Sequence, residues 1–284
     1  MADPKTDTAF DLDDVSVVIV SVIGCEALQR IVSAFTNSGE CIVSSRASGT
    51  VPHRRMAGVL SSQKRLVALV EDTVAVDENW AREAASLLSM PGIVGCAGPV
   101  LIDPKLSPRS KALALADFGR FAPKMIEGLA FGERMSGAAV RVADLPGCNM
   151  AFRRADLVAA LDAVDGFVDN QVFAKLRASG GFLILSPNLT VTYSENDASA
   201  ASLANRLEHG RIYSSRRLEG ASLFARAVGA LRSLALPIVL TGRSARHGAG
   251  MRVLYWAFLQ NLAWSLGEFI GSFSARRHHL THWS

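Results

Sequence analysis

The chain has 284 residues, 49% of them hydrophobic, and a formal net charge of +4. This length suits one large domain or one domain with an appendage, and the apolar content excludes a globally disordered chain. Arginine becomes more frequent toward the C-terminus, which favours an anionic membrane surface as a partner; a merely solvated basic face stays open as the alternative. We expect no nucleic-acid partner, because no recognition motif accompanies the charge.

The cysteines and the N-terminal segment indicate the compartment. The four cysteines lack CxxC spacing, so we expect small buried residues in a reduced compartment, without disulfides or a zinc site. Residues 1–13 are mostly polar and acidic, and we expect them to be disordered and to carry no secretory signal. The sequence therefore predicts a cytoplasmic protein.

The first hundred residues alternate between apolar strands and helices. Strands are predicted over 15–22, 41–44, 66–70 and 92–100, and helices over 27–36, 53–62 and 80–88. The first strand is a continuous β-branched run, which is typical of a strand buried on both faces of a parallel sheet. This order predicts a doubly wound α/β sheet that binds ligands at the carboxyl ends of its strands.

The middle of the chain is less regular. Residues 101–143 contain several Gly and Pro and predict an irregular, inserted active-site segment. A strand over 150–152, helices over 154–164 and 169–179, and an apolar run over 181–191 complete the predicted sheet.

The C-terminal part combines apolar residues with arginine. Residues 221–240 are interrupted at Pro237, and 253–273 are longer and richer in aromatics. At 100° per residue, one side of this second helix carries Gln260, Asn261, Ser265, Gly267, Glu268, Gly271 and Ser272, and the other carries Leu259, Leu262, Leu266, Phe269 and Ile270. Its length allows a membrane span. Because of Glu268 and the polar side, a helix in the membrane interface or packed on the main domain is favoured.

Two adjacent carboxylates, Glu71 and Asp72, follow the apolar run 66–70. Hard cations take carboxylate oxygens, and such a cation neutralises a departing diphosphate. A polar strand end or a helix N-cap is the alternative explanation.

Several segments resemble those of the family 2 glycosyltransferases, inverting enzymes of the GT-A fold. The segments are 66–80, where an apolar strand meets acidic residues ahead of a Trp-led helix; 144–154, with a Gly-x-Asn and a double Arg; and 166–169 followed by 176–180. Weaker similarities lie at 209–213, and at 235–237 together with 267–271. The resemblance extends over roughly residues 14–273 and implies a GT-A-type mixed sheet flanked by helices.

The resemblance implies a role for each matching residue. Asp169 is the expected catalytic base, which deprotonates an acceptor hydroxyl as it attacks the anomeric carbon with inversion. Glu71 and Asp72 are the expected ligands of Mg²⁺ or Mn²⁺ and also contact the nucleotide. Ser21, Gly147 and Asn149 are expected to line the donor site.

Three arginines are candidates for phosphate binding, since guanidinium matches phosphate geometry. Arg54 or Arg55 is expected to pair with the diphosphate, and Arg211 to do so from the acceptor side. Solvated surface arginines are the alternative.

The chain departs from the family at four places. Residues 21–24 replace the usual Pro-Thr-x-Asn, Arg46 stands in a turn that is usually acidic, Thr73 occupies the usual metal-ligand position, and Val168 replaces a Glu. These departures concern nucleotide and metal binding more than the fold.

Two functional hypotheses follow. The first is an inverting transferase that moves a sugar from a nucleotide-diphosphate donor to a lipid-linked or polysaccharide acceptor, peripherally associated with the inner face of the cell membrane. Its GT-A domain is predicted over 14–215, and its amphipathic, membrane-associating helices over 216–284. The second is a non-catalytic GT-A-fold subunit of a glycan-synthesis system. An unrelated nucleotide-binding α/β protein is disfavoured, because neither GxGxxG nor a P-loop occurs in the expected place.

Overall fold

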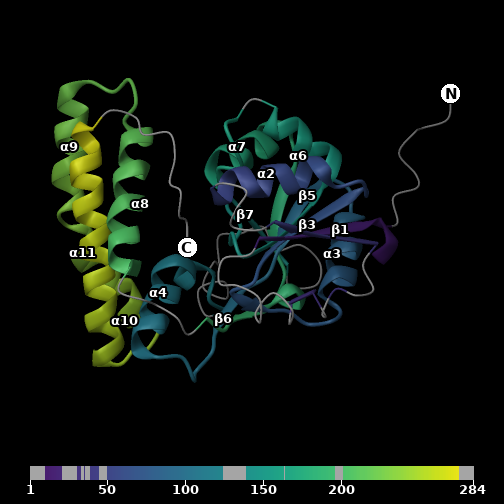
Figure 1. Ribbon diagram of the computed structural model, residues 1–284, viewed down its shortest axis with the longest axis horizontal. Coiled ribbons are helices and arrows are strands. Elements are labelled where there is room, and N and C mark those ends of the chain that lie inside the picture. Colours follow the sequence, from purple (N-terminus) through teal and green to yellow (C-terminus); the bar gives the residue numbers. More distant parts are fainter. Residues whose placement is uncertain are drawn as a thin grey trace. The chain divides into compact units, whose positions relative to one another are not determined.

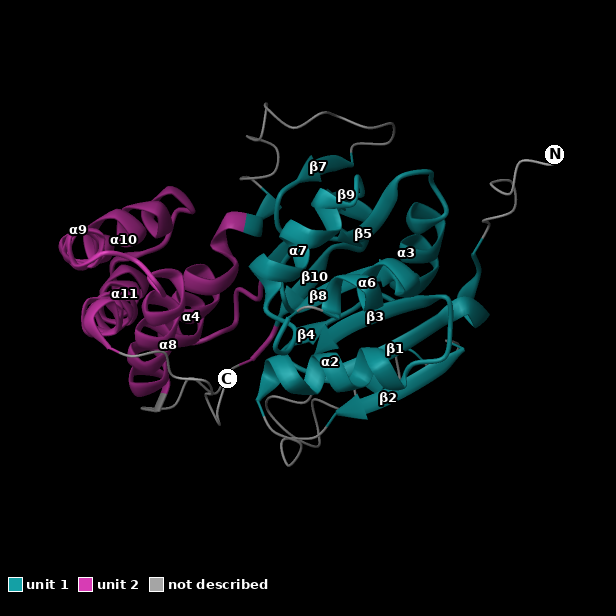
Figure 2. Cartoon of the chain, turned by 90° about the horizontal axis from the view of Figure 1, so that it is seen from above, with its two compact units in different colours: residues 1–101, 121–193 teal, residues 102–120, 194–284 magenta. Residues whose placement is uncertain are grey.

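The structure, a computed structural model, describes residues 10–20, 31–32, 35, 39–44, 50–123, 139–162, 164–195 and 201–274 (Figure 1). The chain forms two compact units, coloured separately in Figure 2. The first unit comprises residues 1–101 and 121–193, and the second comprises 102–120 and 194–284. The predicted helix over 27–36 lies largely outside the described residues.

A seven-stranded mixed sheet of order β2-β1-β3-β8-β5-β9-β7 forms the centre of the first unit. The strands are β1 (Val15–Val20), β2 (Glu40–Ser44), β3 (Leu66–Glu71), β5 (Ile93–Ala97), β7 (Val140–Val142), β8 (Asn149–Arg153) and β9 (Phe182–Leu185). β1 runs parallel to β2 and β3, whereas β8 is antiparallel to both β3 and β5. All six residues of β1 are buried, as its β-branched run predicts.

A smaller sheet and several helices belong to the described part of the first unit. The sheet has the order β4-β10-β6, with β4 at Val74–Ala75, β10 at Val191–Tyr193 and β6 at Val100–Ile102. The helices are α2 (Val51–Ser61), α3 (Trp80–Leu88), α6 (Arg154–Leu161) and α7 (Asp169–Ala178). Figure 1 shows α2, α6 and α7 together on one side of the large sheet and α3 on the other. The predicted α/β architecture, a doubly wound mixed sheet flanked by helices, is confirmed.

The second unit is helical. It contains α4 (Pro108–Phe118), α8 (Ala201–Arg217), α9 (Leu223–Ser233), α10 (Leu236–Arg246) and α11 (Met251–Phe273). The central helix α11 packs against the other four. The predicted C-terminal helical tail is therefore present, and Pro237 lies in the first turn of α10, where a missing N–H leaves no helical hydrogen bond unmade.

Two sequence predictions differ from this organisation. Residues 108–118 form the regular helix α4, so the expectation of an irregular segment over 101–143 is wrong there. The predicted boundary after residue 215 falls inside α8, which packs along α11 in the second unit. Both differences have the same cause. Packing between segments that are distant in sequence brings α4 and α8 to α11, and local sequence patterns do not report such contacts.

Candidate functional site

A buried arginine on α2 brings four of the predicted site residues together. Arg55 donates from Nη1 to Asp169 Oδ1 at 2.9 Å and from Nη2 to Glu71 Oε1 at 2.6 Å. The same Nη2 also donates to the carbonyl oxygen of Gly147 at 2.9 Å. Its guanidinium lies 5.9 Å from the ring centroid of Phe167. We call Arg55, Glu71, Gly147 and Asp169 the Arg55 cluster.

The sheet and its helices explain why these residues meet. Glu71 is the last residue of β3, and its N–H donates to the carbonyl of Cys148 in the turn that leads into β8. Gly147 lies in that same turn. Asp169 begins α7, where a carboxylate is stabilised by the helix dipole. The cluster therefore lies at the carboxyl end of β3, where a doubly wound sheet is expected to bind its ligand.

Gly147 is required by the close approach of the guanidinium. A Cβ built on this residue would lie 2.9 Å from Arg55 Nη2 and 3.2 Å from Asp169 Oδ2. Any side chain at this position would therefore push the arginine away from the carbonyl oxygen that it now contacts.

The electrostatics of the cluster follow from an excess of carboxylates. Burial opposes the charge of Arg55, but Asp169 and Glu71 outweigh that effect and raise its pKa above the usual value. The pKa of Glu71 is also raised: burial is the largest cause, Asp169 and Asp72 add to it, and Arg55 opposes it. Both directions are consistent because one guanidinium faces two carboxylates, Glu71 and Asp169.

The members of the cluster differ in accessibility, and this decides what each can do. The side chains of Arg55 and Glu71 are 8% and 14% exposed, whereas that of Asp169 is 41% exposed. Asp169 is thus the most accessible carboxylate of the cluster, and Arg55 holds it in place.

The neighbouring predicted residues are buried. Arg54 and Arg55 are both below a tenth exposed, so the alternative of a solvated surface pair is wrong. Asp72 and Thr73 are buried as well, and Thr73 Oγ1 donates to Glu71 Oε2 at 3.4 Å.

Asn149 has structural contacts. Its side chain is fully buried, its Oδ1 accepts from the N–H of Gly98 at 3.0 Å, and its Nδ2 donates to the Gly98 carbonyl at 3.3 Å. These bonds tie β8 to the turn after β5. Its predicted contact with a donor sugar stays a prediction.

The last two predicted residues are Ser21 and Arg211. Ser21 lies outside the described residues. Arg211 belongs to α8 in the second unit, where its Nη2 donates to Glu208 Oε1 at 2.5 Å. Its predicted role on the acceptor side stays a prediction.

The donor set does not fit a metal ion by itself. The part of the chain that the structure describes contains no group of three or more His, Cys, Asp or Glu side chains placed to hold one. Of the two predicted ligands, Glu71 already accepts from Arg55 and Thr73. The positive charge at this point is that of the guanidinium, and the predicted Mg²⁺ or Mn²⁺ stays a prediction.

The sequence predicts every member of the cluster as a site residue, but it does not predict that Arg55 joins the others. Arg55 was predicted as a diphosphate partner, whereas it binds the two carboxylates assigned to metal binding and to catalysis. Glu71 is 16 residues and Asp169 114 residues away in sequence. No local pattern connects such distant positions.

Comparisons with known proteins give structural likenesses only. No known protein family and no curated protein matches the sequence. The mannosyltransferase PcManGT from Pyrobaculum calidifontis, solved in complex with GDP-Man and Mn²⁺, is 13% identical; the alignment covers 92% of this chain and 89% of that chain, with a TM-score of 0.49. GalNAc-T7, solved with UDP, GalNAc and Mn²⁺, is also 13% identical over 76% of this chain, with a TM-score of 0.43.

A mycobacterial protein is 10% identical; the alignment covers 69% of this chain and 72% of that chain, with a TM-score of 0.45. This chain covers 52% of GalNAc-T7, about half of that protein. At these identities and scores the likenesses establish no activity for this chain, so function is argued below from its own residues.

Proposed function

We propose that the first unit transfers a sugar from a nucleotide-diphosphate donor to an acceptor hydroxyl, with inversion at the anomeric carbon. One observation carries this proposal. The accessible carboxylate of Asp169 is held by buried Arg55, beside Glu71, at the carboxyl end of β3. This is where a doubly wound sheet binds its ligand, and the sequence resemblance implies that Asp169 is the base and that Glu71 contacts the nucleotide.

The proposed step is a displacement at the anomeric carbon. Asp169 takes the proton of the acceptor hydroxyl while the hydroxyl oxygen forms a bond to the anomeric carbon. The bond between that carbon and the diphosphate oxygen breaks, and its electron pair leaves with the diphosphate. Attack opposite the leaving group inverts the configuration. A positioned general base contributes about 10²–10⁴-fold to such a rate.

Substitution of the base tests the step. We expect Asp169→Asn to lower turnover of the accepted nucleotide sugar by about 10²–10⁴-fold, because an amide cannot take the proton. The matched control is Asp165→Asn, which changes an exposed aspartate that contacts His53 outside the cluster. Equal turnover in the wild type and Asp169→Asn would refute the catalytic role.

Calorimetric titration with UDP, GDP and dTDP, each with and without Mn²⁺, tests the donor site. We expect one nucleotide to bind and Glu71→Ala to lower its affinity. If the nucleotide binds only with Mn²⁺, a metal ion belongs to the donor site. If it binds without Mn²⁺, Arg55 supplies the positive charge of the site.

One observation favours the second candidate, a non-catalytic subunit of a glycan-synthesis system. Arg55 already occupies both Glu71 and Asp169, which leaves the site without a built metal position. If no nucleotide binds and no nucleotide sugar is turned over, this candidate replaces the first.

A further inference from the structure

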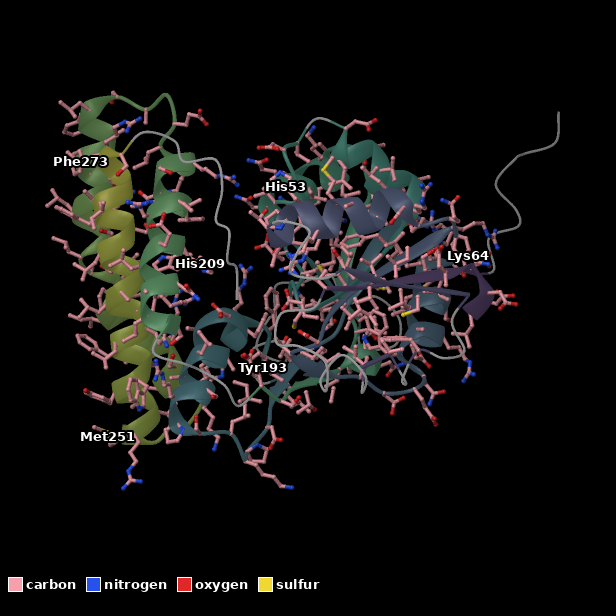
Figure 3. The ribbon with its side chains drawn as sticks, in the orientation of Figure 1. His53, Lys64, Tyr193, His209, Met251 and Phe273 are labelled. Carbon is pink, nitrogen blue, oxygen red and sulfur yellow. The ribbon has the colours of Figure 1, made fainter. Side chains whose placement is uncertain are left out.

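The central helix of the second unit, α11, buries its polar side and exposes its apolar side, which is the reverse of an amphipathic helix in a water-soluble domain. Its buried residues are Ala257, Gln260, Asn261, Ser265, Gly267, Glu268, Gly271 and Ser272. The apolar side is exposed and includes Met251, Tyr255, Phe258, Leu266, Phe269, Ile270 and Phe273. Figure 3 labels Met251 and Phe273 at the two ends of α11. An amphipathic helix in water buries its apolar side instead.

The buried polar side chains bind to one another and to the neighbouring helices. Gln260 Nε2 donates to Ser202 Oγ on α8 at 3.1 Å, and Asn261 Nδ2 donates to Thr241 Oγ1 on α10 at 3.2 Å. Ser265 Oγ donates to the Ser233 carbonyl on α9 at 2.5 Å. Polar contacts between helices of this kind hold helices together where lipid, not water, surrounds them.

The one acidic residue of α11 is also bound internally. Glu268 is 4% exposed, accepts from Trp264 Nε1 at 2.6 Å and pairs with Arg217 at 3.0 Å. Its charge is therefore compensated inside the unit and does not reach the exposed apolar side.

Helices α9 and α10 extend the exposed apolar surface. Phe224 and Ile238 are 79% and 74% exposed, and Leu223, Leu231, Leu234 and Val239 are exposed as well. We call the exposed apolar side chains of α9, α10 and α11 the outer face. An apolar surface of this extent marks an interaction site.

The charge on the outer face identifies its partner. Residues 221–274 contain five arginines and one acidic residue, the buried Glu268. Four of these arginines are exposed: Arg232, Arg243, Arg246 and Arg252. Exposed apolar residues together with exposed arginines complement the acyl chains and the anionic headgroups of a bilayer.

Among the described helices, none passes the test of length and hydropathy for a membrane span by itself. The pair α9 and α10 passes that test together, but the two helices meet at a bend of 45°.

We propose that the outer face of α9, α10 and α11 docks on an anionic lipid bilayer. Phe224, Ile238 and Met251 enter the boundary between headgroups and acyl chains, while the exposed arginines bind headgroup phosphates. The proposal does not depend on sugar transfer, because it concerns only the second unit.

Vesicle sedimentation of the full chain tests this docking. We expect the wild type to sediment at low salt with vesicles of phosphatidylcholine and phosphatidylglycerol, and to bind pure phosphatidylcholine more weakly. Phe224→Ser combined with Ile238→Ser is expected to weaken binding at least about tenfold. Arg243→Ala combined with Arg246→Ala is expected to weaken it by about fivefold per arginine and to reduce its salt dependence.

The matched control is Val43→Ser combined with Leu60→Ser, which removes two exposed apolar residues of the first unit. This variant is expected to bind like the wild type, and unchanged far-UV circular dichroism shows that all variants are folded. Failure of the wild type to bind either vesicle overturns the proposal, as does an equal loss in the control.

Sedimentation velocity without lipid separates a protein partner from a lipid one. If the wild type is an oligomer that the Phe224→Ser and Ile238→Ser substitutions convert to a monomer, and vesicles do not compete with it, the outer face binds a second copy and the lipid proposal is wrong. Because the readout is vesicle binding, its failure is distinct from a failure to transfer sugar.

Discussion

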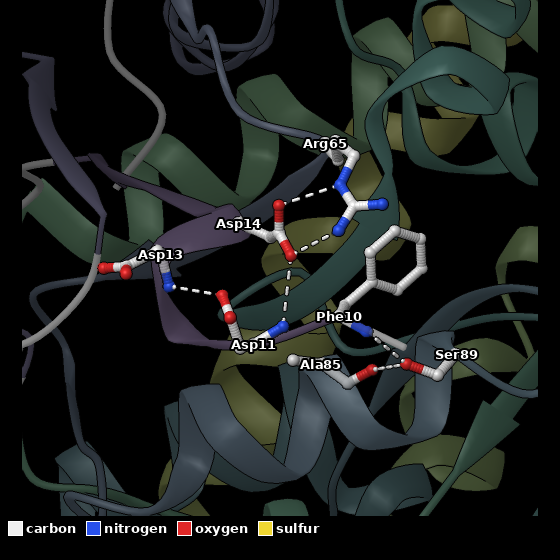
Figure 4. Close-up of polar contacts among 7 residues, drawn as sticks. All are labelled: Phe10, Asp11, Asp13, Asp14, Arg65, Ala85 and Ser89. Carbon is white, nitrogen blue, oxygen red and sulfur yellow. Dashed lines mark hydrogen bonds and ion pairs between the residues drawn. The ribbon is translucent and has the colours of Figure 1, made fainter. Parts of the chain in front are cut away.

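At the residue scale, the Arg55 cluster depends on the pairing of buried charges. A buried ion pair contributes little net stability, but loss of one partner leaves an uncompensated charge and costs about 3–5 kcal/mol. An exposed pair contributes at most about 1 kcal/mol. Figure 4 shows such a pair, Arg65 with Asp14, joined by bonds of 2.6 and 2.8 Å. The two arginines therefore make the same kind of contact in opposite surroundings.

Replacement of each arginine measures the difference in stability between the buried and the exposed ion pair. We expect Arg55→Met to lower the free energy of unfolding by about 3 kcal/mol, because Glu71 is left buried without its cation. Arg65→Met is the matched control, since its side chain is 53% exposed, and it is expected to cost no more than about 1 kcal/mol. Urea unfolding measures both, and equal losses would show that the Arg55 cluster is not electrostatically coupled.

The raised pKa of Glu71 predicts the sign of a pH effect. A carboxyl whose pKa is higher in the folded state binds its proton more tightly there, so its contribution to stability is present below its usual value of 4.5 and is lost as pH rises through the folded value. We therefore expect the wild type to lose stability relative to Glu71→Gln as the pH is raised above about 4.5. Thermal unfolding across this range measures the difference, and the opposite slope would contradict the raised pKa.

At the element scale, two glycines set the distance between α11 and α8. A Cβ on Gly267 would lie 1.9 Å from the carbonyl oxygen of Leu207, and one on Gly271 would lie 2.1 Å from that of Arg211. The helix backbones approach each other closely only because these side chains are absent. The same approach brings the buried polar residues of α11 within hydrogen-bond distance of their partners.

A methyl group added at Gly267 tests the close packing of α11 against α8. We expect Gly267→Ala to destabilise the second unit by about 1–3 kcal/mol, because overpacking forces the two helices apart. Gly242→Ala is the matched control: a Cβ there meets nothing within 4 Å, and alanine in the interior of α10 is expected to stabilise it by about 0.5–1 kcal/mol. Thermal unfolding followed by circular dichroism separates the opposite signs.

At the scale of the whole molecule, strand β1 of the first unit and helix α11 of the second bury opposite kinds of residue. The first unit buries β-branched strands such as β1, whereas α11 of the second buries amides, hydroxyls and a glutamate. Water explains the first arrangement through the removal of apolar surface. The second is the arrangement that the proposed docking on lipid requires.

Local patterns by themselves determined most of the elements. Period and β-branching placed β1, β3 and the helices after Trp80 and Arg154, because a strand or a helix is specified by neighbours in sequence. The same patterns found both sides of α11 and the carboxylate Glu71 at the end of β3, whereas the resemblance to the family 2 glycosyltransferases pointed to Gly147 and Asp169.

Only the tertiary structure decided which of these features meet and which side faces inward. The polar side of α11 is its buried side, where Gln260, Asn261 and Ser265 donate hydrogen bonds to partners on α8, α10 and α9. Arg55 holds Asp169 and Glu71 because β3, α2 and α7 converge at one edge of the sheet. Periodicity separates the two sides of a helix, but burial depends on contacts between distant segments, which sequence spacing does not contain.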